Sequence, residues 1–211
     1  MDYIDNLIIR YPALEACRQS LLHSYEILES CYSGGHKLLV AGNGGSCADS
    51  EHIVGELMKG FKLPRHCSDL FKAKLIEIDP QSGEFLSEKL QKALPAIALD
   101  NHPALNTAII NDVGNGGSMI YAQQVFGYGA LGDVFLGIST SGNSKNVYFA
   151  SVTAKAMGLK VIGLTGAGGG KIAEISDCAI KVPETETYKV QELHLPIYHA
   201  LCLMLENHFF A

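Results

Sequence analysis

Five short apolar runs, each followed by a segment of helical length, constrain the fold of this chain more than any other feature. The runs are continuously apolar rather than alternating, which is typical of parallel strands covered by helices on both faces. They are KLLVAG (37–42), LPAIAL (94–99), DVFLGIST (133–140), LKVIGLTG (159–166) and CAIKVP (178–183). This pattern predicts a strand at each of the five positions.

The segments between and after these runs have the length and the apolar spacing of helices. We expect helices over 46–60, 103–110, 118–130, 144–157, 169–176 and about 190–208. Strand–helix alternation of this kind implies right-handed crossovers between parallel strands. The predicted fold is therefore an α/β three-layer αβα sandwich built on a five-stranded parallel sheet.

Two segments lie outside this alternation. Residues 1–35 carry apolar side chains at helical spacing, with an interruption expected at Pro12 and an end at Gly34-Gly35. Residues 62–93 form a long connection with the polar centre DPQSGE, which predicts a partly helical insertion of functional importance or mobility. We treat residues 1–211 as a single domain that carries this helical N-terminal segment and this insertion.

The composition excludes several kinds of partner. The 211 residues include 16 basic and 22 acidic ones, and the formal charge of −6 offers no basic face to nucleic acid or a membrane. No apolar run approaches the roughly 18 residues of a membrane span. The six cysteines are scattered, and the N-terminus lacks the pattern of a secretory signal, so we expect reduced thiols in a cytoplasmic protein.

Three of the predicted strands end in glycine- or hydroxyl-rich turns that begin helices. The turns are AGNGGS (41–46), GISTSGNSKN (137–146) and LTGAGGGK (164–171). Ligands of open parallel sheets bind at the carboxyl ends of strands, where helix N-termini offer free N–H groups to anions. The second turn carries four hydroxyls, on Ser139, Thr140, Ser141 and Ser144, and predicts phosphate binding because a helix cap needs only one of them. The third turn is better explained as ordinary turn punctuation, and the dinucleotide and P-loop fingerprints are not matched.

His52 and Glu56 lie four positions apart, on one face of the helix expected to begin at Ser46. The pair is compatible with a metal ion, or with a base and its partner beside a substrate. It is also compatible with a hydrogen bond on an exposed helix face, and spacing alone favours this last interpretation.

The C-terminal segment 188–206 predicts a helix with further polar side chains, namely Gln191, Glu192, His194 and His199. Gln191 and His199 are eight positions apart, which is about 12 Å of rise in a continuous helix. Both residues therefore reach one ion only if their side chains converge, if the helix breaks, or if a neighbouring subunit contributes. Pro196 lies between them and offers a place for such a break.

Taken together and in order, these motifs resemble the sugar-isomerase (SIS) domain family and, within it, the bacterial phosphoheptose isomerases. The likeness runs from about residue 36 to the C-terminus. The motifs that carry it are GNGGS (42–46), HIVGE (52–56), ND (111–112), GISTSGNS (137–144), TG…GGK (165–171) and QELH…H (191–199). The resemblance implies the flavodoxin-like sandwich of SIS domains.

The resemblance also implies roles for individual residues. Its implied contacts to the sugar phosphate are Asn43, Gly44, Gly45, Ser46, Asn111, Asp112, Ser139, Thr140, Ser141, Ser144 and Gln191. Glu56 and His199 correspond to the catalytic acid/base pair. The family's zinc positions, with one ion per subunit, correspond to His52, Glu56, Gln191 and His199. The resemblance further implies a homotetramer with sites at subunit contacts.

The activity implied is aldose–ketose isomerisation through an enediol, from sedoheptulose 7-phosphate to D-glycero-D-manno-heptose 7-phosphate. The alternatives are an isomerase of another phosphosugar, a non-catalytic sugar-phosphate sensor, and a scaffold like the SIS protein that binds the bacterial replication initiator. That scaffold lacks the glutamate and the second histidine that this chain keeps at Glu56 and His199, which favours an enzyme. The insertion at 62–93, Tyr188 in place of an acidic residue, and Pro196 depart from the family pattern. They concern substrate choice and metal geometry.

Overall fold

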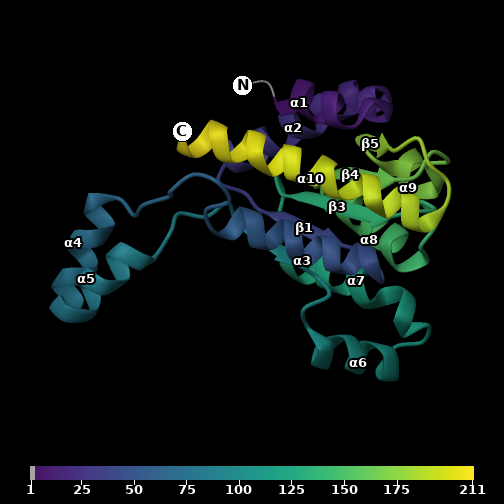
Figure 1. The fold of residues 1–211 in the computed structure, drawn as a ribbon. Helices are drawn as coiled ribbons and strands as arrows, with labels where there is room; N and C mark the ends of the chain where they lie inside the picture. The colour runs from purple at the N-terminus through teal and green to yellow at the C-terminus, as the bar shows by residue number, and fades with distance from the viewer. Residues whose placement is uncertain (1–2) are drawn as a thin grey trace.

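A five-stranded parallel sheet forms the centre of the chain, of which the computed structural model describes residues 3–211 (Figure 1). The strands are β1 (Leu38–Ala41), β2 (Ala96–Ala98), β3 (Val134–Ser139), β4 (Lys160–Thr165) and β5 (Cys178–Lys181). They lie in the order β2-β1-β3-β4-β5, and all neighbouring strands are parallel. The predicted fold class and all five predicted strands are confirmed.

The helices cover both faces of the sheet. The helical elements are α1 (Tyr3–Arg10), the 3₁₀ helix η1 (Pro12–Cys17), α2 (Arg18–Ser33), α3 (Gly45–Met58), α4 (Asp69–Ile78), α5 (Pro80–Lys89), α6 (Pro103–Asp112), α7 (Gly116–Tyr128), α8 (Lys145–Ala156), α9 (Gly170–Ile175) and α10 (Thr187–Phe210). One buried cluster joins α1, α2, α3 and α10 to one face of the sheet, and a second joins α7, α8 and α9 to the other. Alternate residues of a strand point into different clusters: in β1, Leu38 and Val40 belong to the first and Leu39 and Ala41 to the second. Both faces of the strand are therefore buried, which explains the continuous apolar runs.

The sheet reverses its order of strands between β1 and β3. From β1 the chain proceeds to β2 at one edge, and it then returns to add β3, β4 and β5 on the other side. Ligand sites of open α/β sheets lie outside the carboxyl ends of strands at such a reversal. The turns after Ala41 and Ser139 therefore occupy the place where a ligand is expected.

The insertion predicted at 62–93 is a helical hairpin of α4 and α5 that projects away from the sheet (Figure 1). Its helix caps are local, since the side chains of Ser68 and Asp79 accept hydrogen bonds from the N–H groups of Phe71 and Ser82. No residue of α4 is buried, so the hairpin contributes little to the described core. The expected helical content is confirmed.

Two prolines have different outcomes. Pro12 interrupts the N-terminal helical segment as predicted, because α1 ends at Arg10 and η1 begins at Pro12. The break considered at Pro196 is absent, and α10 continues through it as one helix of 24 residues. Pro196 and its neighbours Ile197 and Tyr198 are buried, so packing on the core compensates the lost main-chain hydrogen bond.

The cysteines and the hydropathy of the helices complete the description of the fold. All six cysteines are free thiols, of which Cys17, Cys31, Cys178 and Cys202 are buried and the other two are half-buried. None of the helices within residues 3–211 is both long and apolar enough to cross a membrane.

Candidate active site

The turn between β1 and α3 is shaped by glycine. Gly44 has a φ of +58°, a backbone conformation that favours glycine, and it precedes the first residue of the helix. A Cβ at Gly45 would lie 2.6 Å from Nε2 of Gln191, so the absence of a side chain lets this residue of α10 approach the turn. Helix α3 thus begins at Gly45 rather than Ser46, and the predicted residues Gly45 and Gln191 lie side by side.

Asn43 connects this turn to the neighbouring loop across the strand reversal. Its side-chain amide exchanges two hydrogen bonds of 2.9 Å with the amide of Asn146 on α8. The hydroxyl of Tyr121 on α7 donates to the Gly42 carbonyl at 2.5 Å. The turns after β1 and β3 are therefore held together by side chains.

The hydroxyl loop, residues 139–144, lies at the end of β3. Ser139 is buried, and its Oγ lies 2.9 Å from Oγ of Ser144. Ser144 is the N-cap residue of α8, yet its side chain makes no capping hydrogen bond. The Ser144 hydroxyl is thus not used as an ordinary helix cap. Ser141 is exposed and Thr140 is half-buried, so both are within reach of a ligand from solvent.

The glycine turn after β4 supports the hydroxyl loop from behind. Its residues come so close to Gly142 that a Cβ there would lie 1.8 Å from the Gly169 carbonyl oxygen. The N–H groups of Gly166 and Ile172 donate to the carbonyls of Thr140 and Gly142, each at 3.0 Å. These contacts agree with the structural role that the sequence favoured for this turn.

His52 and Glu56 meet on α3 as their spacing predicts. Nε2 of His52 lies 3.1 Å from Oε1 of Glu56, and Lys59 donates to the other carboxylate oxygen at 3.2 Å. Nδ1 of His52 lies 3.0 Å from the hydroxyl of Tyr198, which donates to Asp49 at 3.2 Å. The Glu56 side chain is 12% exposed and the His52 side chain 42%, so the carboxylate is shielded from solvent while the imidazole stays open to it.

His199 of α10 faces this pair across the helix interface. Its ring centroid is 4.9 Å from that of His52, and the two rings are nearly perpendicular. The ring of Phe61 lies on it at 5.4 Å. Burial, together with the nearby His52, lowers the pKa of His199, which favours the neutral imidazole that can both accept and donate a proton. The structure thus brings Glu56 and His199 together around His52.

The four predicted zinc positions do not converge within one subunit. His52, Glu56 and His199 cluster at the middle of the α3–α10 interface, whereas Gln191 contacts Gly45 at the beginning of α3. Both ring nitrogens of His52 already have partners in Tyr198 and Glu56. Across residues 3–211 no group of three or more histidine, cysteine, aspartate or glutamate side chains is arranged to hold a metal ion.

Asn111 and Asp112 lie at the end of α6. Both are exposed, and the Asn111 amide donates to the Asp112 carboxylate at 2.7 Å. Their role in binding a substrate stays a prediction.

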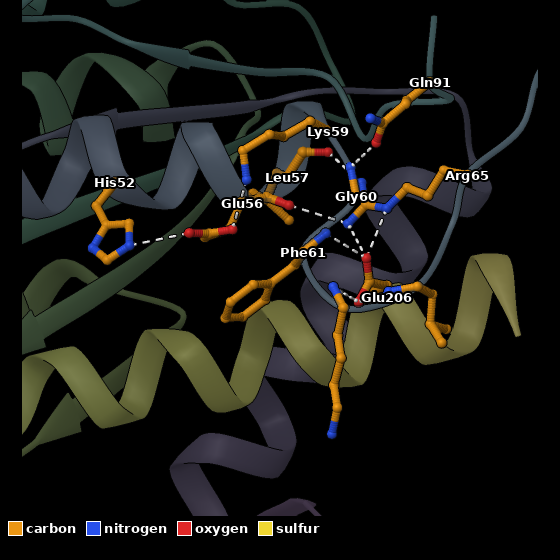
Figure 2. A network of polar contacts seen from close by, with 11 residues as sticks. His52, Glu56, Leu57, Lys59, Gly60, Phe61, Arg65, Gln91 and Glu206 are labelled. Carbon is orange, nitrogen blue, oxygen red and sulfur yellow. Dashed lines mark hydrogen bonds and ion pairs between the residues drawn. The ribbon is translucent and has the colours of Figure 1, made fainter. Parts of the chain in front are cut away.

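Sequence reasoning missed a buried ion pair at the C-terminal end of α3, Arg65 with Glu206 (Figure 2). It also missed Tyr198, Asp49 and Phe61, whose side chains support His52 and His199. The sequence held one signal for the ion pair. Glu206 directly follows the apolar run 201–205 and lies on the buried face of α10. A carboxylate at such a position requires a buried partner.

Comparison with known proteins extends the similarity over most of the chain. The family model described as SIS domain matches residues 86–166. The phosphoheptose isomerase of Geotalea daltonii is 42% identical over 186 residues, which are 88% of this chain and 82% of that relative. The solved structure of phosphoheptose isomerase from Neisseria gonorrhoeae has a TM-score of 0.73 at 32% identity, covering 96% of this chain and 94% of that one. The structure of a phosphoheptose isomerase from Francisella tularensis has a TM-score of 0.76 at 30% identity, with 97% and 95% covered.

Proposed function

The chain belongs to the phosphoheptose isomerase family, and from that premise we propose that it converts sedoheptulose 7-phosphate into D-glycero-D-manno-heptose 7-phosphate. It is an aldose–ketose isomerase by this membership. Among the structural observations, the one that supports the assignment best is that Glu56 and His199 both contact the His52 ring, Glu56 at Nε2 and His199 with its ring centroid 4.9 Å away. This arrangement gives one base and one proton carrier at the same place.

The reaction proceeds through an enediol. Glu56 removes the proton from the carbon next to the carbonyl, and His199 carries a proton between the two neighbouring oxygens. Glu56, whose proton can exchange with solvent at this stage, then returns a proton to the adjacent carbon and completes the conversion of ketose to aldose. Hydrogen bonds from His52 and Lys59 hold the Glu56 carboxylate in place for these steps.

The phosphate end of the substrate binds at the reversal of strand order. The hydroxyl loop offers Ser139, Thr140, Ser141 and Ser144 beside the N-terminus of α8, whose free N–H groups favour an anion. The turn at 43–46 and the Gln191 amide contact the sugar. In this proposal the proton transfers take place at the α3–α10 interface, and the two loops bind the substrate.

Zinc at His52, Glu56, Gln191 and His199, with one ion per subunit, is a proposal for the assembled enzyme only. Within one subunit the four side chains do not surround a common point, so the donor set is incomplete without movement or a neighbouring chain. A Glu56 carboxylate bound to zinc would also be a poorer base. Metal analysis of the purified enzyme, and its activity after chelation and after return of zinc, test this proposal.

A homotetramer with sites at subunit contacts is supported by large apolar side chains on the described surface. On the α4–α5 hairpin these are Leu70, Phe71, Ile78, Phe85 and Leu86, and Ile78 is 84% exposed. A projecting hairpin with such side chains is a natural element of an interface. Light scattering of the purified chain measures the assembly.

The substrate assignment is tested by incubating the purified enzyme, with and without zinc, with sedoheptulose 7-phosphate. We expect a heptose aldose phosphate, identified by mass and NMR, and incorporation of solvent deuterium at the carbon that exchanges its proton. If the enzyme leaves this ketose unchanged in both conditions, the substrate assignment fails. Pentose and hexose phosphates in the same panel reveal an isomerase of another phosphosugar, and tight binding without turnover reveals a sensor or a scaffold.

A further inference from the structure

A buried carboxylate fixes the chain segment that follows α3. Both oxygens of Glu206 accept main-chain hydrogen bonds, from the N–H groups of Phe61 at 2.7 Å, Lys62 at 2.8 Å and Leu63 at 3.1 Å (Figure 2). Burial alone would raise the pKa of Glu206, but these main-chain donors and Arg65 outweigh it and lower the pKa. Glu206 therefore stays charged and holds three consecutive residues in one conformation.

Arg65 connects this carboxylate to the last turns of α3. Its Nε donates to Glu206 at 3.0 Å, while Nη1 donates to the Leu57 carbonyl at 2.7 Å and Nη2 to the Glu56 carbonyl at 3.1 Å. The final carbonyls of a helix have no hydrogen-bond partner within the helix, and the buried guanidinium supplies donors to two of them. Its positive charge also interacts favourably with the negative, C-terminal end of the helix dipole. The guanidinium also lies over the Phe210 ring at 4.5 Å and is 0% exposed.

The ion pair is thus connected to both residues of the proposed acid/base pair, directly to Glu56 and through Phe61 to His199. Arg65 bonds directly to the main chain of Glu56, and Glu206 bonds directly to the main chain of Phe61, whose ring packs on His199. The Arg65 and Glu206 side chains are themselves buried, at 0% and 1% exposed, and their contacts to Glu56 and Phe61 are to the main chain. If Arg65 had a purely structural role, a substitution there would lower stability but leave kcat per folded enzyme unchanged.

We propose that Arg65 and Glu206 are positioning residues of the isomerase, which set the Glu56 carboxylate and the His199 ring at the separation that proton transfer requires. This inference rests on the proposed function, because it assigns the pair a role in the same reaction. A displacement of about 1 Å in a reacting group can cost on the order of 10²-fold in rate. An ion pair that fixes the end of α3 is therefore able to control turnover without touching the substrate.

Arg65→Lys keeps the charge but cannot hold Glu206, Leu57 and Glu56 at once, because an ammonium lacks the guanidinium fork. Glu206→Gln keeps the shape but places an amide N–H among main-chain donors. We expect each variant to lower kcat by about 10- to 100-fold and to leave KM within about twofold, since the phosphate loop lies elsewhere. Phe61→Leu leaves the ion pair intact, removes the ring from His199, and is expected to lower kcat by about 10-fold.

Asp133→Asn is the matched control. Asp133 is also a buried carboxylate, paired with Lys37, and it accepts main-chain hydrogen bonds from Lys37 and Ala130, but it lies at the amino ends of β1 and β3. We expect this control to lower the unfolding temperature and to keep kcat per folded enzyme. Wild-type kcat in both Arg65→Lys and Phe61→Leu would overturn the proposal. These two variants decide it even when Glu206→Gln does not fold.

A second measurement does not depend on the substrate. Because the Phe61 ring lies 5.4 Å from the His199 ring, we expect its ring current to shift the NMR signals of the His199 imidazole, which are assigned by their loss in His199→Gln. We expect Arg65→Lys to move these signals and Asp133→Asn to leave them in place, and unchanged signals in Arg65→Lys would contradict the positioning role. If the wild-type enzyme does not isomerise sedoheptulose 7-phosphate, the proposed function fails while this comparison still decides the role of Arg65.

Discussion

Glu56 is the residue on which the proposed reaction depends most. Its carboxylate is largely shielded from solvent and accepts hydrogen bonds from His52 and Lys59. Glu56→Gln keeps the shape of the side chain but removes the base, and His199→Gln removes the proton carrier. We expect each change to lower kcat by about 10²–10⁴-fold, with little change in substrate affinity, in an assay of product formation by NMR.

Glu51→Gln is the control for this prediction, because Glu51 lies on the same helix but is exposed. It is expected to keep the wild-type rate. Substrate affinity is measured separately, by calorimetry with the inactive variants. Wild-type rates in both Glu56→Gln and His199→Gln would refute the acid/base assignment.

The contacts of individual residues were predictable from the sequence only where they are local. The His52–Glu56 contact follows from a separation of four on a helix, and the structure confirms it. The Tyr198 contacts to His52 and Asp49 join residues 146 and 149 positions apart, and Arg65 and Glu206 are separated by 141. Such pairs depend on how α10 packs against α3, which no local pattern specifies.

At the scale of elements, hydrophobic pattern and turn residues predicted most of the fold. The strand expected over 133–140 is Val134–Ser139, and the helix expected over 144–157 is Lys145–Ala156. These elements are buried on the sheet, so their apolar pattern carries a strong signal. The continuity of α10 through Pro196 was not predictable, because the core contacts that compensate a proline arise only after folding.

The role of the hydroxyl loop in phosphate binding can be tested by removing a single hydroxyl. The Ser144 side chain is not used to cap α8, so Ser144→Ala removes a donor without unfolding the helix. A hydrogen bond to a charged group contributes about 1.5–3 kcal/mol, and we therefore expect KM for the phosphosugar to rise by about 10-fold or more with kcat nearly unchanged.

Thr153→Ala is its matched control on the same helix, because the Thr153 hydroxyl donates within the helix, to the Phe149 carbonyl at 2.9 Å. This variant is expected to keep the wild-type KM. A wild-type KM in Ser144→Ala would exclude this hydroxyl from phosphate binding.

At the scale of the whole molecule, the order of the strands decides where the site lies. The apolar runs predict five parallel strands, but they do not state that β1 lies between β2 and β3. This order brings the Asn43 turn and the hydroxyl loop together, where Asn43 and Asn146 exchange hydrogen bonds. The position of the α4–α5 hairpin was equally beyond the sequence, because its helices are capped locally and α4 buries no residue in the core.

The stability of the whole molecule should depend on pH through His194. This residue of α10 is 0% exposed, and burial lowers the pKa of its imidazole from 6.5 to about 4. Between about pH 6.5 and 4 the unfolded chain binds a proton that the folded chain does not, so the free energy of unfolding falls as the pH falls. Above pH 6.5 this contribution is fully present and constant.

From pH 7 to pH 5 we therefore expect a loss of about 2 kcal/mol from this residue, measured by urea unfolding at fixed protein concentration. His194→Leu should make most of this loss disappear, because leucine binds no proton. A smaller slope should remain from His199, whose pKa burial also lowers. His23→Gln, at an exposed position of α2, should keep the full slope. An unchanged slope in His194→Leu would mean that other groups cause the loss of stability in acid.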